Sequence, residues 1–372
     1  MDAPAKLQLT GIRKTYAGTT ALSGLSVSFE GGKVHAVIGK NGSGKSTMVK
    51  ILTGAVQPTA GEIRLDGRPV RFHSPKDAFA AGIAAVYQEL SLIPGMTVAE
   101  NILLGRLPKR RNGLIDWKRA MLDAEALLQS VGCSIPADAV VKDLSLWQQQ
   151  VVEIAKAMSF SPSVLLLDEP TSALARHETD NLFRVVRELK RKDVAVIYIT
   201  HRLQELAAIA DTVTVLRDGD LIGRVPAEQA SPQVMVGMMF GDAEVRRRPD
   251  DLTVGAEPVL EVNGLARAPY FRDIRFSVRK GEVLGIAGML GSGRTELLRA
   301  IFGADPFEEG EVAVNGRRVE RSSPARMKRL GVAMTPESRK DEGLVLSLGA
   351  RHNLVLASLE SLTKKWWFSA GL

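Results

Sequence analysis

The sequence predicts an α/β protein in which strands and helices alternate, arranged as two copies of one domain in tandem. Three observations carry this prediction. Short apolar runs rich in β-branched residues alternate with amphipathic helical patterns, a glycine-rich turn joins one such strand to a helix, and the chain resembles itself at a constant offset. The length of 372 residues leaves room for two or three domains.

The internal repeat is clearest in two glycine-rich segments, GGKVHAVIGKNGSGKST near the start and KGEVLGIAGMLGSGRTE further along. One offset, without a gap, pairs Gly39 with Gly288, Gly54 with Gly303, Gly61 with Gly310, Gly67 with Gly316 and Pro75 with Pro324. Such agreement indicates duplicated domains. We therefore expect a first domain over residues 1–240, a short polar linker over 241–258 and a second domain over 259–372.

Within the first copy, the predicted elements follow each other in order: strand VHAVIG and helix KSTMVKILTG, strand SVLLLDEP and helix HETDNLFRVVRELKRK, strand VAVIYIT and helix QELAAIA. In each copy this alternation predicts a parallel sheet covered on both faces. Two further helices, one opened by Asp116 and closed near Gly132 and one over residues 148–159, predict a helical lobe inserted into the α/β core. The second copy stops at Leu372, so we expect it to contain only the N-terminal part of the domain.

Composition restricts the function classes. The net charge of +7 and pI near 9.5 suit nucleic acid, an anionic membrane surface or a phosphate ligand, although a solvated basic surface explains them as well. The single cysteine, Cys133, excludes an internal disulfide and fits a reducing compartment. The segment MDAPAKLQLTG has no apolar core of signal-peptide type, and no stretch approaches the roughly 20 apolar residues of a membrane span. We therefore expect any membrane role to come through partner chains.

The segment GKNGSGKST, residues 39–47, matches the phosphate-binding pattern G-x-x-x-x-G-K-[ST] between a strand and a helix. Glycines let backbone N–H groups wrap the phosphates, Lys45 reaches the β- and γ-phosphates and Ser46 can hold Mg²⁺. The predicted nucleotide contacts are Gly39, Asn41, Gly42, Ser43, Gly44, Lys45, Ser46 and Thr47. A glycine-rich turn without a ligand is the alternative, which Lys45 and the strand-to-helix context disfavour.

The segment VLLLDEP, residues 164–170, is a buried strand that ends in two acids. Asp168 would orient Mg²⁺ through water, and Glu169 would be the general base for an attacking water. An acid pair that caps the next helix is the alternative, and the phosphate loop upstream makes the catalytic interpretation the stronger one.

These motifs resemble the ATP-binding cassette (ABC) family over nearly the whole chain. The resemblance implies ATP and Mg²⁺, and it assigns three further roles. Gln88 in AVYQEL would link the metal to transporter contacts, and Tyr16 would stack on adenine. His201 in YITHRLQE would be a switch histidine, which completes the catalytic set with Lys45 and Glu169. The family's signature segment is LSLWQ here, so Ser145 would contact the γ-phosphate bound by another domain.

The chain also departs from the family pattern. Trp147 stands where the signature has glycine, and Ala175 stands where the loop after the acidic strand usually ends in Asp. The second phosphate loop, with candidate nucleotide contacts Gly288, Gly291, Gly293, Arg294 and Thr295, has Arg294 in place of lysine, and the offset aligns Glu337 with Gln88. Arginine neutralises phosphate but presents a planar fork, so this exchange is not conservative.

Together these features resemble the fused monosaccharide importer subunits of bacteria, of the ribose, xylose and galactose type. That resemblance implies two membrane permease subunits as partners, an extracytoplasmic sugar-binding protein as an indirect one, dimerisation of ABC domains, and a peripheral location on the cytoplasmic side of the inner membrane. In a head-to-tail pair, Trp147 would face the already altered Arg294 loop. Two alternatives are a soluble ABC ATPase that acts on ribosomes or nucleic acid, and an ATP-binding remnant with little turnover; we expect no nucleic-acid partner.

Overall fold

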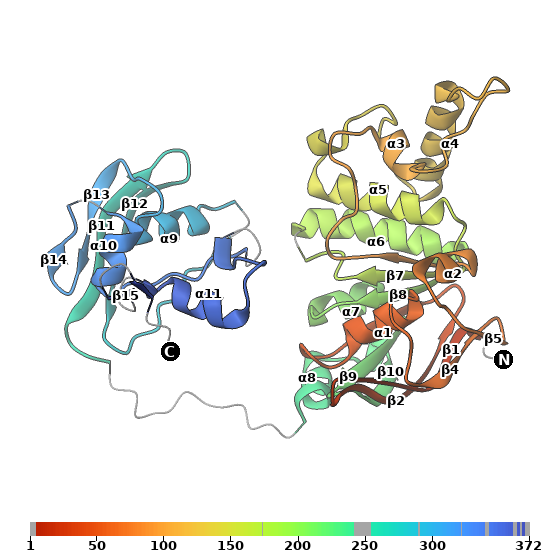
Figure 1. Ribbon diagram of the computed structural model, residues 1–372, viewed down its shortest axis with the longest axis horizontal. Coiled ribbons are helices and arrows are strands. Elements are labelled where there is room, and N and C mark those ends of the chain that lie inside the picture. The colour runs from red at the N-terminus through yellow and green to blue at the C-terminus, as the bar shows by residue number, and fades with distance from the viewer. Residues whose placement is uncertain are drawn as a thin grey trace. The chain divides into compact units, whose positions relative to one another are not determined.

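The computed structural model describes residues 5–172, 174–241, 254–288, 291–320, 322–338 and 342–359, together with the backbone of 363–364 and 367–368. The chain divides into two compact units, Met1–Arg246 and Arg247–Leu372 (Figure 1). Most of the predicted linker 241–258 lies outside the described residues, so the predicted domain limits stay predictions.

The first unit contains an antiparallel sheet in the order β2-β1-β4-β5. Its strands are β1 (Ala5–Tyr16), β2 (Thr19–Glu30), β4 (Ala60–Leu65) and β5 (Arg68–Val70). One face of this sheet is apolar, with Leu7, Leu9 and Ile12 of β1 buried. The sequence analysis did not predict this sheet, because register shifts near Gly11 interrupt the simple alternation of β1.

The central sheet of the first unit has six strands in the order β10-β9-β3-β8-β7-β6. The strands are β3 (Val34–Ile38), β6 (Ile83–Val86), β7 (Val164–Asp168), β8 (Ala195–Ile199), β9 (Thr212–Arg217) and β10 (Asp220–Pro226). All but β10 pair in parallel. The prediction of a parallel sheet is confirmed for this unit.

Two apolar cores cover the two faces of the central sheet. Leu165 and Leu167 of β7 point into one core, and Leu166 of the same strand points into the other. One core lies between the central and antiparallel sheets around α1 (Lys45–Leu52). The other includes α6 (Arg176–Arg191) and the helical lobe. The remaining elements outside the lobe are α2 (Pro75–Ala80), α7 (Leu203–Ile209), η2 (Ala227–Gln229) and α8 (Pro232–Phe240).

The predicted helical lobe is present and consists of α3 (Val98–Ile102), α4 (Trp117–Ser130), η1 (Val141–Asp143) and α5 (Leu146–Met158). Figure 1 shows α3, α4 and α5 beyond α6, on the side away from the antiparallel sheet. Asp116 caps α4 as expected, because its carboxylate accepts a hydrogen bond from the N–H of Arg119 at 3.2 Å. Among the described residues, no helix is both long and apolar enough to cross a bilayer.

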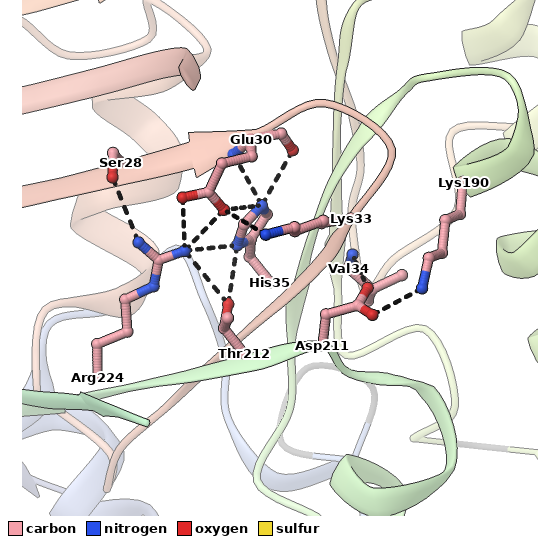
Figure 2. A network of polar contacts seen from close by, with 9 residues as sticks. All are labelled: Ser28, Glu30, Lys33, Val34, His35, Lys190, Asp211, Thr212 and Arg224. Atoms are coloured by element: carbon pink, nitrogen blue, oxygen red, sulfur yellow. Dashed lines mark hydrogen bonds and ion pairs between the residues drawn. The ribbon is translucent and has the colours of Figure 1, made fainter. Parts of the chain in front are cut away.

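A polar cluster joins β2, β3, β9 and β10 at the amino-terminal end of β3 (Figure 2). Arg224 contacts the Glu30 carboxylate at 2.9 and 3.2 Å and lies 3.2 Å from the imidazole of His35. His35 is fully buried, and Thr212 lies 2.9 Å from its Nδ1. Burial lowers the pKa of His35, so the neutral imidazole is the form that this cluster holds.

The second unit has a four-stranded antiparallel sheet in the order β12-β11-β13-β14, which repeats the order β2-β1-β4-β5. Its elements are β11 (Pro258–Arg267), β12 (Phe271–Arg279), α9 (Arg294–Phe302), β13 (Glu309–Val314), β14 (Arg317–Arg318), α10 (Pro324–Arg329), α11 (Ala350–Leu356), β15 (Thr363–Lys364) and β16 (Trp367–Phe368).

The expected parallel sheet is not formed in the described part of the second unit, and this prediction is wrong there. Residues 283–288, the counterpart of β3, are not a strand, and Val283 is 86% exposed. In the first unit β3 pairs with β8 and β9, which come more than 150 residues later. The described residues of the second unit include no counterpart of those two strands, so 283–288 has no neighbour with which to form a ladder.

The backbone repeats in finer detail than the strand order. Gly61 lies so close to Gly11 that an added Cβ would sit 2.5 Å from the Gly11 carbonyl oxygen, and Gly310 meets Gly264 in the same way at 2.4 Å.

In each unit, an asparagine side chain also forms a hydrogen bond to the backbone eight residues earlier. Asn101 Oδ1 accepts a hydrogen bond from the N–H of Ile93 at 2.7 Å. Asn353 Oδ1 accepts one from the N–H of Val345 at 2.8 Å.

Candidate nucleotide site

The phosphate-binding loop joins β3 to α1, and its glycines are required by its shape. An added Cβ on Gly39 would sit 2.3 Å from the carbonyl oxygen of Leu216 in β9 and 2.4 Å from Ser43 Oγ. Gly44 begins α1 with φ of 102°, and its Cβ would sit 2.7 Å from the carbonyl oxygen of Ala21. The loop is therefore wedged between two strands, with the N-terminus of α1 directed at its hollow.

Lys45 is 8% exposed, and its ammonium group donates hydrogen bonds to the carbonyl oxygens of Gly39 at 2.7 Å and Lys40 at 3.1 Å. Burial lowers the pKa of Lys45, while the carboxylates of Glu169 and Asp168 act in the opposite direction. Ser43 is fully buried, and its hydroxyl has no partner. This cradle therefore offers the Lys45 ammonium group to an anion.

The carboxyl ends of four parallel strands bring the other predicted residues to one edge of the sheet. β3 leads into the phosphate loop, β8 into His201, β7 ends in Asp168 and Glu169, and β6 leads into Gln88. The strand order β3-β8-β7-β6 sets these groups side by side along that edge. Ligands of open α/β sheets bind at this edge.

Glu169 and His201 form the tightest pair at the edge, with His201 Nδ1 3.1 Å from Glu169 Oε1. Glu169 has φ of 49°, in the left-handed region that non-glycine residues rarely adopt. Its N–H donates to the carbonyl oxygen of Ile199 at 2.9 Å, which ties β7 to β8. Burial raises the pKa of Asp168, the Glu169 carboxylate adds to this, and Lys45 opposes it.

The oxygen donors at this edge fit Mg²⁺. Ser46 presents a hydroxyl, Gln88 an amide oxygen and Asp168 a carboxylate, and Mg²⁺ prefers hard oxygen ligands and retains several waters. The described residues contain no cluster of three His, Cys, Asp or Glu side chains able to hold a metal by themselves. Ser46 and Gln88 are exposed. The site thus suits a metal shared with a phosphate ligand and not an all-protein cage.

Two predicted contacts lie on other elements. Tyr16 ends β1 in the antiparallel sheet, is 40% exposed, and has the ammonium of Lys14 5.0 Å from its ring centroid. Ser145 begins α5 in the helical lobe, where Gln148 Oε1 accepts hydrogen bonds from the Ser145 N–H at 2.9 Å and from its hydroxyl at 3.0 Å. Trp147 is half-buried and packs against the lobe core. Asn41 and Gly42 are exposed, and Thr47 is half-buried.

The described glycines of the second phosphate loop repeat the close approaches seen in the first. An added Cβ on Gly288 would sit 2.4 Å from Ser292 Oγ, and one on Gly293 would sit 2.4 Å from the carbonyl oxygen of Tyr270. Gly291 and Gly293 have φ of 76° and 83°. The side chains of the two loops differ. Arg294 is exposed where Lys45 is buried, and the Thr295 hydroxyl lies 3.5 Å from Glu337 Oε2.

Sequence reasoning missed a buried polar group beside the site. Glu205 in α7 is 6% exposed and accepts hydrogen bonds from the hydroxyls of Thr171, Tyr198 and Thr200. The available signal was its spacing, because Glu205 lies four residues before Ile209 on the buried face of the helix.

Comparisons with known proteins agree with this geometry. A family model described as ABC transporter matches residues 22–172 and 271–364. A ribose import ATP-binding protein of Streptomyces avermitilis is 45% identical, with 98% of this chain and 69% of that protein aligned. The corresponding protein of Rubrobacter xylanophilus is 47% identical over 95% and 70%. A putative ribose/galactose/methyl galactoside import ATP-binding protein of Burkholderia cenocepacia is 43% identical over 97% and 71%.

Solved structures show the same fold. The ADP conformation of an ATP-binding cassette of an ABC transporter superposes with a TM-score of 0.58 at 26% identity, covering 64% of this chain and all of that one. A dimeric ATP-binding cassette bound to ADP and Pi gives 0.51 at 26% identity, covering 59% and 98%. With the phosphate loop, the strand-end acids and the helical lobe, these matches show that the chain belongs to the ABC transporter family and is an ABC ATPase.

Proposed function

We propose that the chain is the ATP-hydrolysing, energy-coupling subunit of a bacterial importer for a simple sugar. The observation that carries the chemistry is the convergence of Lys45, Asp168, Glu169 and His201 on one edge of the central sheet. The names of the similar proteins, which specify import of ribose or of ribose, galactose and methyl galactoside, support a monosaccharide as the cargo.

The proposed chemistry follows from the atoms at that edge, together with Tyr16 at the end of β1. Backbone N–H groups of residues 39–47 and the ammonium of Lys45 bind the β- and γ-phosphates, and Tyr16 stacks on adenine. Ser46, Gln88 and Asp168 would hold Mg²⁺, which neutralises charge on the phosphate oxygens. Glu169 takes a proton from the attacking water. His201, whose Nδ1 lies 3.1 Å from Glu169 Oε1, orients the Glu169 carboxylate.

Energy coupling requires two nucleotide-binding units and a membrane partner. We infer that ATP closes a pair of ABC domains and that hydrolysis reopens them, so that closure moves two permease subunits fed by an extracytoplasmic sugar-binding protein. The chain would act from the cytoplasmic face of the inner membrane as a peripheral protein. The dimeric ATP-binding cassette among the similar structures supports such pairing.

Replacing Glu169 by Gln tests this function, because the two side chains have nearly the same size. In membranes prepared from cells that carry the transporter, we expect Glu169→Gln to keep the affinity for ATP within about twofold of wild type. The rate of ATP hydrolysis should fall by a factor of about 100 or more. Uptake of radiolabelled ribose, xylose and galactose, measured in parallel in the same cells, should fall for the transported sugar. Unchanged turnover would remove Glu169 as the base, and unchanged uptake of all three sugars would refute sugar import.

A further inference from the structure

The carboxylate of Glu205 is the centre of a buried cluster between two strand ends. Its Oε1 accepts a hydrogen bond from the Thr171 hydroxyl at 2.6 Å. Its Oε2 accepts from the Tyr198 phenol at 2.8 Å and from the Thr200 hydroxyl at 3.0 Å. Thr171, Tyr198 and Thr200 are each at most 1% exposed.

All three partners of this carboxylate donate a hydroxyl group, so each of its oxygens has a partner at the carboxyl end of β7 or β8. Burial and the charge of Glu205 both raise the pKa of Tyr198, so its phenol keeps the proton that it donates. Arg202 forms an ion pair with this carboxylate, with its Nη1 3.7 Å from Glu205 Oε1. Hydrogen bonds that converge on one buried group form a network that fixes its geometry.

The two segments held by Glu205 carry the proposed catalytic pair. Thr171 follows Glu169 by two residues at the end of β7, and Thr200 directly precedes His201 at the end of β8. Arg202 adds a second link, because its Nη2 donates to the carbonyl oxygen of Ser172 at 2.8 Å. Each segment is therefore tied to the other from the buried side.

Both members of the pair depend on such support. Glu169 adopts φ of 49°, a backbone state that persists only where the surroundings fix it. The His201 side chain is 54% exposed and lies 3.1 Å from the Glu169 carboxylate. Its position follows from that of Thr200 and Arg202.

We propose that Glu205 is a positioning residue for ATP hydrolysis, which holds the segments of Glu169 and His201 in register through Thr171 and Thr200. The proposal rests on the catalytic roles proposed above for Glu169 and His201. Glu205 itself lies behind the reacting edge and acts only through these residues.

The test removes one link without opening a cavity. Thr171→Val replaces a hydroxyl by a methyl group of similar size. It removes the hydrogen bond from the β7 segment to Glu205 and the 3.4 Å contact between the Thr171 hydroxyl and the Tyr198 phenol. Thr214→Val is the matched control, because Thr214 is 1% exposed in β9 of the same sheet and its hydroxyl has no partner. Both variants are made in the full chain.

The first readout is kinetic and uses the assembled transporter. Thr171→Val should lower kcat for ATP about 10- to 100-fold, since a misplacement near 1 Å costs that much, and should leave KM within about twofold. Thr214→Val should keep both constants. An unchanged kcat in Thr171→Val overturns the proposal.

The second readout does not depend on turnover. The chain has five histidines, and the signal of His201 in a histidine-labelled NMR spectrum is assigned by its loss in His201→Ala. Glu169→Gln should shift this signal in wild type, and the shift should fall by at least about half in the Thr171→Val background. An undiminished shift overturns the proposal. If Glu169→Gln leaves hydrolysis intact, the proposed function fails, and this readout still decides whether Glu205 positions the pair.

Discussion

Adding a single methyl group at Gly39 should damage the nucleotide site without removing any functional group. The alanine Cβ would sit 2.3 Å from the Leu216 carbonyl oxygen and 2.4 Å from Ser43 Oγ. Real Cβ atoms do not approach oxygen this closely. Because one of the two obstacles is backbone in β9, the loop must move away from the sheet, and the N–H groups that would wrap the phosphates move with it.

The magnitude follows from the cost of overpacking. One extra methyl group in a close-packed environment costs about 1 to 3 kcal/mol. If the nucleotide-bound loop bears that cost, ATP affinity falls about 5- to 150-fold. If the free protein bears it instead, the free energy of unfolding of the first unit falls by the same amount.

Gly95→Ala is the matched control, because nothing lies within 4 Å of its Cβ position and its backbone does not need positive φ. Titration with a fluorescent ATP analogue and urea unfolding of the same samples measure both costs. Gly39→Ala should weaken binding, destabilise the fold or do both, and Gly95→Ala should do neither. Wild-type values for Gly39→Ala in both assays would refute the description of the loop as wedged against β9.

Two further predictions concern other parts of the first unit. The folded-state pKa of His35 is lowered by burial beside Arg224, so the unfolded chain takes up the proton first as pH falls below about 6.5. Urea unfolding should show stability that is full above this pH and declines below it, with a smaller decline in His35→Gln; equal declines would contradict the cluster of Figure 2. Trp147→Gly by itself should give no large gain in ATPase activity, because in a head-to-tail pair Trp147 would face the loop that carries Arg294. A large gain would refute this pairing of Trp147 with Arg294.

The sequence was sufficient where the chemistry is local. The phosphate loop is one contiguous segment, and its spacing predicts a strand, a turn and a helix. In the structure these elements are β3, the loop and α1. The helical lobe was predictable for the same reason, since Asp116 and the 3.6-residue period mark α4 within a single stretch. The roles assigned to the site residues stay predictions.

The sequence was insufficient where a feature depends on partners distant in the chain. Glu205 accepts hydrogen bonds from Tyr198 and Thr200 at the carboxyl end of β8, but also from Thr171, which lies 34 residues earlier. Strand formation has the same dependence. VHAVI is a fully buried strand because β8 and β9 flank it, whereas the similar apolar run at 283–288 forms no strand in the described unit.

The structure around Trp147 shows that this residue does not disturb the start of α5. The N-terminus of α5 keeps its capping box, in which Ser145 and Gln148 satisfy each other, so the helix begins normally despite the indole. Trp147 even adds apolar contact to the lobe core. Trp147 is therefore compatible with the fold of the helical lobe. We expect it to affect only a group that approaches the N-terminus of α5 from outside. The resemblance puts a second nucleotide-binding unit at this place. The expected pairing of Trp147 with the Arg294 loop must therefore be tested through activity and not through stability.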